Sequence, residues 1–133
     1  MRFAGILVLA AVVFAQSPQY HPVASSKQIM AGVCKPAMDS LVAMNKAGGP
    51  KDEKEWELAH QHAALLTETA QLLLMGNRPL DQDVWIKSSK NLEAAAEKVA
   101  QAAQSRDVEA WKSSFNTVGS ACRSCHNVHK KKQ

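Results

Sequence analysis

The sequence predicts an all-α fold, an antiparallel four-helix bundle, on the strength of three observations. First, the chain of 133 residues is 46% hydrophobic but only 5% aromatic, a composition that disfavours β-sandwiches. Second, its middle is rich in Ala, Leu, Glu, Lys and Gln, which are good helix formers. Third, four amphipathic segments are joined by short breaks, which favour antiparallel neighbours. The composition also argues against collagen-like or disordered chains, disulfide-dense miniproteins and large two-domain enzymes.

Residues 1–15, MRFAGILVLAAVVFA, are typical of a secretory signal peptide. Arg2 gives a positive start, an uncharged apolar run follows, and the small residue Ala15 ends it. The run is about 12 residues long, whereas a helix needs about 20 to cross a bilayer. An uncleaved N-terminal anchor is the alternative. Residues 16–24, which contain two prolines, are predicted to be an extended leader.

A first helix is predicted over about residues 26–45, with Ser25 or Ser26 as the N-cap. Pro36 lies inside this range. Because proline lacks an N–H and its ring collides with the preceding turn, we expect a kink there. The sequence NKAGGP at residues 45–50 ends the helix. The apolar residues that recur at helical spacing are Ile29, Met30, Val33, Ala37, Leu41 and Met44.

The second and third helices are bounded by strong breaks. The second is predicted to begin near Asp52, where acidic residues in the first turn complement the helix dipole, and to end at Gly76 before Pro79. The third is predicted from about Asp81 to Gln104. The apolar positions of the second are Trp56, Ala59, Ala63, Leu66, Ala70 and Leu73, and those of the third are Trp85, Leu92, Ala96, Val99 and Ala103.

The fourth helix carries the clearest period. It follows a turn at residues 105–107, in which Asp107 is the predicted N-cap. Alternating steps of three and four then give an a/d stripe, made of Val108, Trp111, Phe115, Val118, Cys122, Cys125 and His129. Residues 25–133 are therefore predicted to form one four-helix-bundle domain.

Two of the three cysteines stand in the run Cys122-Arg123-Ser124-Cys125-His126, and Cys-x-x-Cys-His is the attachment pattern of c-type haem. The two thiols add across the two vinyl groups of one porphyrin, and residues three apart on a helix lie on one face about one turn apart. His126 then reaches the iron from the same side. The motif predicts one covalent haem c, held by Cys122 and Cys125, with His126 as an axial ligand.

The motif has three other interpretations. A redox disulfide of the thioredoxin type belongs near a βαβ unit, whereas this motif ends a helical chain. Half of a zinc site lacks a second cysteine pair, and His129 would be an untypical partner. The third interpretation is a chance match. Covalent haem explains the spacing, the position and the export signal together.

The position of the motif, in the last helix and seven residues before the end, resembles the class II c-type cytochromes, the cytochrome c′ family. The resemblance covers nearly all of the chain after residue 15 and implies a four-helix bundle with the haem motif on the last helix. Family members tend to have a basic residue four positions after the haem histidine, where Lys130 stands. His129 occupies a place where the family often has an aromatic residue.

The resemblance also implies that the first helix supplies the residue on the other side of the iron. Matching residues 28–30 and the turn at 46–48 to that helix puts Met30 there. A Met at this place gives a low-spin electron carrier, because its thioether binds haem iron and raises the potential, whereas an apolar residue leaves the iron five-coordinate. We interpret Met38, Met44 and Met75 as core residues. We interpret Cys34 as a small buried hydrophobe, with a distal-pocket thiol or an intermolecular disulfide as alternatives.

The sequence therefore predicts a monohaem c-type cytochrome that carries single electrons in the bacterial periplasm between redox partner proteins, and it predicts no enzyme activity. The alternative is a five-coordinate haem protein that binds nitric oxide or carbon monoxide. A haem peroxidase would need a polar acid or base beside an open iron, for which the first helix offers only Lys27, Gln28, Lys35 and Asp39.

Charge and hydropathy limit the other partners. The net charge is +4, but the basic residues are dispersed, which argues against a nucleic-acid partner. No segment after the signal peptide is apolar enough to be expected to span a membrane. The family resemblance allows a homodimer through the first helices.

Overall fold

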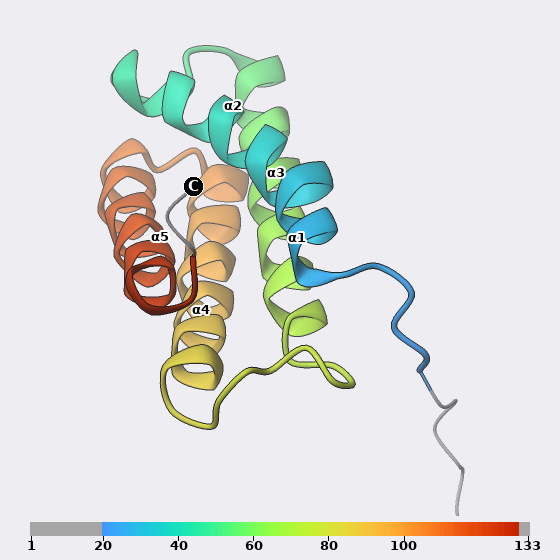
Figure 1. Cartoon of the computed structure of the whole chain (residues 1–133). Coiled ribbons are helices and arrows are strands. Elements are labelled where there is room, and N and C mark those ends of the chain that lie inside the picture. The colour runs from blue at the N-terminus through green and yellow to red at the C-terminus, as the bar shows by residue number, and fades with distance from the viewer. Residues whose placement is uncertain (1–19, 131–133) are drawn as a thin grey trace, which may run out of the picture.

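The computed structural model describes residues 20–130, and every regular element in that range is a helix (Figure 1). The predicted all-α four-helix bundle is confirmed. The elements are α1 (Ser26–Ile29), the π-helical η1 (Met30–Cys34), α2 (Lys35–Lys46), α3 (Glu53–Leu72), α4 (Val84–Ser105) and α5 (Val108–His129). The predicted signal peptide at residues 1–15, and the leader as far as residue 19, lie outside the described residues.

The elements α1, η1 and α2 follow one another without a break and form the first helix of the bundle. A capping box begins it: the Ser25 hydroxyl accepts from Gln28 N at 3.3 Å, and the Gln28 side chain accepts from Ser25 N at 2.9 Å. Where the sequence predicts a kink at Pro36, the structure has a π turn just before it, in which Lys35 N donates to Met30 O. Since Pro36 has no N–H to donate, the helical ladder is already interrupted at this point.

The π turn changes which residues share a face of the first helix. One extra residue is absorbed in the turn, so everything after it is rotated by about 100° relative to a straight α-helix. Met30 and Met38 are eight positions apart in sequence but behave like residues seven apart, which is about two full turns. We infer that the two methionines lie on the same face.

The three remaining helices have side-chain caps or clear stop signals. Asp52 caps α3 by accepting from Glu55 N at 2.8 Å, and Asp107 caps α5 by accepting from the N–H groups of Glu109 and Ala110. Arg106, which follows α4, adopts the left-handed conformation with φ of 55°. These signals fix the reversals that make the bundle antiparallel.

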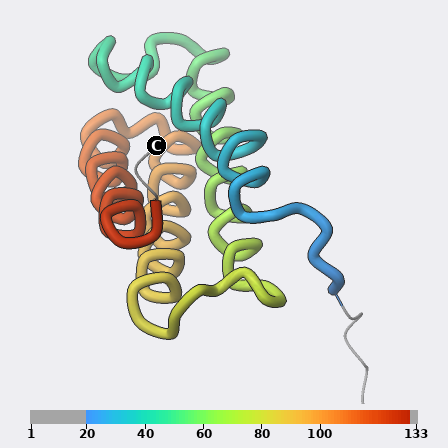
Figure 2. Tube along the Cα trace, in the orientation of Figure 1, coloured from blue at the N-terminus to red at the C-terminus, as the bar shows by residue number. Residues whose placement is uncertain are grey.

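Small side chains bring α3, α4 and α5 close together. The helix α4 packs along both α3 and α5, and the trace in Figure 2 shows the three running side by side. Alanines are buried on these helices at positions 59, 63, 70, 95, 96, 102 and 103. The largest fully buried side chains are Trp111, Leu41, Leu66, Val99, Val118 and Thr69.

The first helix is the loosely packed member of the bundle. It packs on α3 but makes little contact with α5, although the two helices face each other. In Figures 1 and 2 it crosses α3 obliquely. The space on the α5 side is thus open to a group that the polypeptide does not itself provide. None of the helices between residues 20 and 130 has the length and hydropathy of a membrane span.

Candidate functional site

The Cys-x-x-Cys-His motif lies in the last two turns of α5, and the helix is unbroken through it. Cys122 and Cys125 are half-buried and His126 is exposed. Burial raises the pKa of both thiols, more strongly than the nearby charge of Arg123 lowers that of Cys122. Partial burial and then the positive charge of Lys130 lower the pKa of His126. The thiols and the imidazole are therefore neutral at neutral pH, and neutral imidazole is the form that binds iron.

Residues near the start of α4 pack against the motif. Ser88 Oγ lies 3.1 Å from Ser124 Oγ, inside the motif. One turn earlier, the Trp85 ring meets the His129 ring edge-on, with 5.4 Å between centroids. Trp85 is itself fixed, because its indole N–H donates to Leu73 O at 2.9 Å. The motif thus packs against another helix and not against a loop.

Asp81 ties the two helices together at the same end. One of its carboxylate oxygens accepts from Asp83 N at 2.9 Å and from Trp85 N at 3.1 Å, and the other lies 2.5 Å from His129 Nε2. Sequence reasoning found Asp81 only as a helix start and His129 only as a stripe position. Nothing in the sequence pairs the two residues, because the contact depends on how α4 packs on α5.

Replacing Asp81 by Asn is expected to lower the stability of the protein at neutral pH, with the loss shrinking in acid. Burial raises the pKa of Asp81. Hydrogen bonds from the Trp85 and Asp83 N–H groups and the pair with His129 together lower it by more, so the net pKa lies below 3.8. A carboxylate with a lowered folded-state pKa stabilises the fold above its unfolded pKa, and this stabilisation is lost as pH falls through the folded value. Urea unfolding at pH 7 and at a pH below 3.8 measures the difference in the free energy of unfolding between the wild type and Asp81→Asn. A difference that is the same at both pH values contradicts the prediction.

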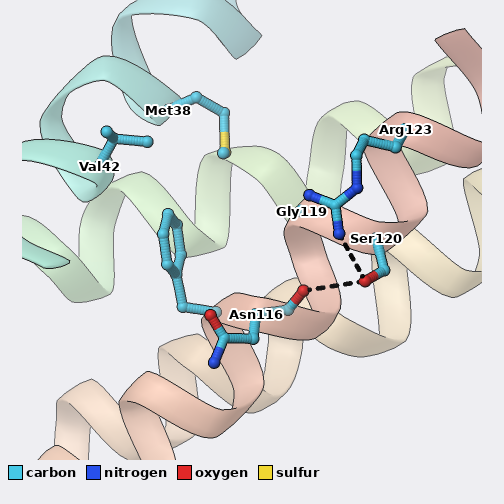
Figure 3. Close-up of a pocket in the computed structure, with 7 residues that line it drawn as sticks. Met38, Val42, Asn116, Gly119, Ser120 and Arg123 are labelled. Carbon is cyan, nitrogen blue, oxygen red and sulfur yellow. Dashed lines mark hydrogen bonds between the residues drawn. The ribbon is translucent and has the colours of Figure 1, made fainter.

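A cavity of about 470 Å³ lies between α2 and α5 (Figure 3). Its α2 wall is apolar, and its α5 wall carries polar groups and one guanidinium. The volume falls within the range of small-molecule and cofactor sites, about 300–1,000 Å³. The lining residues are Met38, Val42, Phe115, Asn116, Gly119, Ser120 and Arg123.

The residues around this cavity fit a haem. A porphyrin is a flat apolar ring that carries two carboxylates, and the cavity offers apolar side chains on one wall and Arg123 on the other. Gly119 leaves space beside Arg123, because a Cβ at this position would lie 3.3 Å from the Arg123 guanidinium. On α5 the cavity extends from Phe115 to Arg123, the residue after Cys122, so a ring bonded to the two cysteines would lie next to it. The motif and the cavity thus form one site.

The first helix and α5 run in opposite directions, so their residues can be paired by level. The chain just after α2 meets the start of α5, since a Cβ on Gly49 would lie 2.6 Å from Val108. Further along, Met38 faces the cavity together with Gly119. Seven residues on from Gly119, α5 reaches residue 126. Eight residues back from Met38, with one absorbed in the π turn, the first helix reaches Met30. By this count Met30 and residue 126 are at the same level of the bundle.

The methionines and Cys34 differ in their surroundings. Met30 and Met38 are both half-buried against the core, but only Met38, predicted as a core residue, lines the cavity. Cys34 is buried at 8% exposure, as expected for a small buried hydrophobe. Burial, and then nearby Cys122, raise the pKa of Cys34 to about 11, so it stays a neutral thiol. Its burial does not fit an intermolecular disulfide.

The zinc interpretation finds no support in the part of the chain that the structure describes. Between residues 20 and 130 no group of three His, Cys, Asp or Glu side chains is placed to hold a metal ion. A structural zinc site needs four such ligands.

Comparison with known proteins agrees with the site. Residues 80–130, from the loop before α4 through α5 and the motif, match the family model described as Cytochrome C'. No curated protein and no solved structure matches the chain. The family binds covalently attached haem c. The matched helices, the four-helix bundle and the Cys-x-x-Cys-His motif together support a class II c-type cytochrome.

Proposed function

We propose that the protein carries single electrons through one haem c that is bonded to Cys122 and Cys125. His126 binds the iron from α5, and Met30 binds it from the first helix. The observation that carries the proposal is the match in level between Met30 and His126 across the poorly packed side of the bundle. The haem, when bound, supplies a one-electron ferric/ferrous couple. The protein works in the periplasm between redox partner proteins and uses no catalytic residues.

The described residues have the chemistry that an electron carrier needs. The neutral His126 imidazole gives a nitrogen ligand, and the soft thioether of Met30 favours ferrous over ferric iron. The alanine-rich packing of α4 on α3 and α5 is close, which limits movement of the site when the charge on the iron changes. With His126 and Met30 both bound, the iron would have no free position for a substrate.

One observation favours the second candidate, a five-coordinate haem that binds nitric oxide or carbon monoxide. Met30 does not line the cavity, whereas Met38 does, and Met38 lies about two turns from the level of His126. If neither sulfur reaches the iron, the distal side stays open. The two candidates share covalent attachment and differ only in the sixth ligand.

Replacing Met30 by Ala tests the choice. The wild-type ferric protein is expected to be low-spin with the weak red-edge band of methionine ligation, and Met30→Ala to be high-spin without that band. Optical spectra and the yield of carbon monoxide complex measure both changes. The matched control is Met38→Ala, which removes the same side chain from the same face and is expected to keep the band. A high-spin wild type that Met30→Ala leaves unchanged contradicts the proposal and supports gas binding.

A further inference from the structure

The position of Arg123 around α5 relates it to one edge of the haem. At about 100° per residue, the order around the helix is Cys125, Cys122, His126 and then Arg123. If the two cysteines are bonded to the vinyl edge of the ring and His126 reaches its centre, continuing in the same direction would lead to the edge that carries the two propionates, and Arg123 stands on that side of α5.

The Arg123 guanidinium has space around it and, among residues 20–130, no acidic partner. Its Nη2 donates to Ser120 Oγ at 3.0 Å, the contact drawn in Figure 3. Among residues 20–130, the ion pairs of the structure do not involve Arg123. The side chain lies over Gly119, where a Cβ would approach Nη1 to 3.3 Å, and it faces the apolar wall formed by Met38 and Val42. An arginine at the edge of an apolar cavity is suited to a ligand that is apolar in its body and anionic at its end.

We propose that Arg123 binds a haem propionate and that Gly119 provides the space in which the pair forms. The proposal rests on the proposed function, because it takes the haem to be bonded to Cys122 and Cys125. A guanidinium binds a carboxylate through two parallel hydrogen bonds. The pair neutralises one negative charge of the cofactor. Ferrous iron is therefore favoured, since reduction adds negative charge to the site.

The test measures the midpoint potential of the holoprotein. Arg123→Gln removes the charge, Arg123→Lys keeps the charge without the planar fork, and Lys98→Gln removes a charge from an exposed residue of α4 as the matched control. Arg123→Gln is expected to shift the ferric/ferrous ratio about tenfold toward ferric, which is a potential lower by about 59 mV. Arg123→Lys is expected to shift it less than Arg123→Gln, and Lys98→Gln less than twofold. Raised salt reduces the effect of Lys98 more than that of a contact pair.

Gly119→Ala tests the space without changing any charge. Its methyl group meets the guanidinium, so the potential is expected to fall in the same direction as in Arg123→Gln, by a smaller amount. Equal potentials of Arg123→Gln and Lys98→Gln overturn the propionate pair. If Arg123→Gln does not accumulate, Arg123→Lys and Gly119→Ala test the proposal in its place. Wild-type midpoint potentials in both of these variants also overturn the propionate pair. A wild-type chain without covalent haem instead defeats the proposed function.

Discussion

Haem is expected to leave the denatured protein in acid–acetone when Cys122 and Cys125 are both replaced by Ala, and to stay with the wild type. In acid the imidazole of His126 is protonated and releases iron, so only thioether bonds can hold the porphyrin through the extraction. Each single variant keeps one thioether and is expected to retain haem weakly or in lower yield. The measurement is the haem absorbance of the protein pellet, together with the intact mass.

Cys34→Ala is the matched control for this experiment. It also removes a thiol, but one that is buried in the core and stays protonated, and it is expected to leave the haem attached. Loss of haem from Cys34→Ala alone contradicts the assignment of the three thiols. His126→Ala separates bonding from ligation, because the covalent haem remains while its spectrum changes.

Local patterns in the sequence determine most of the fold. The turn at residues 105–107 with its Asp107 cap and the stripe of the last helix predict α5 almost to the residue, at Val108–His129. The second and third helices are shorter than predicted, because α3 ends at Leu72 and α4 begins at Val84. At the end of α3 the helix tightens into a turn in which Leu74 N donates to Gln71 O and Met75 N to Leu72 O, and Arg78 also donates to Leu72 O at 2.8 Å, a carbonyl that a longer helix would have used.

The candidate site, like the fold, is predictable from the sequence only where a local pattern determines it. The attachment motif is contained in five consecutive residues, so sequence alone predicts its chemistry. Pro36 signals a disruption of the first helix, but it does not reveal a π turn, and that turn decides which methionines face α5. The Asp81–His129 pair and the position of Arg123 over Gly119 depend on helix packing, which no local pattern encodes.

Replacing Trp111 by Ala is expected to destabilise the protein by about 3–5 kcal/mol, the usual loss for a buried tryptophan. Trp111 is fully buried and its ring lies parallel to that of Phe115, with 5.5 Å between the ring centroids. Alanine leaves a cavity at the start of α5, where α5 packs against α4. Denaturant unfolding followed by far-UV circular dichroism measures the change in the free energy of unfolding.

Trp111→Phe separates packing from hydrogen bonding at the same position. The indole N–H is buried and finds no acceptor among residues 20–130, so phenylalanine removes no hydrogen bond and relieves an unsatisfied donor. We expect it to cost less than Trp111→Ala, because the phenyl ring fills most of the space that alanine would leave empty. A loss equal to that of Trp111→Ala would show that the N–H has a partner. Since Trp111 lies about three turns of α5 from the motif, both variants should keep the wild-type haem spectrum, and a changed spectrum would mean that core packing sets the iron ligands.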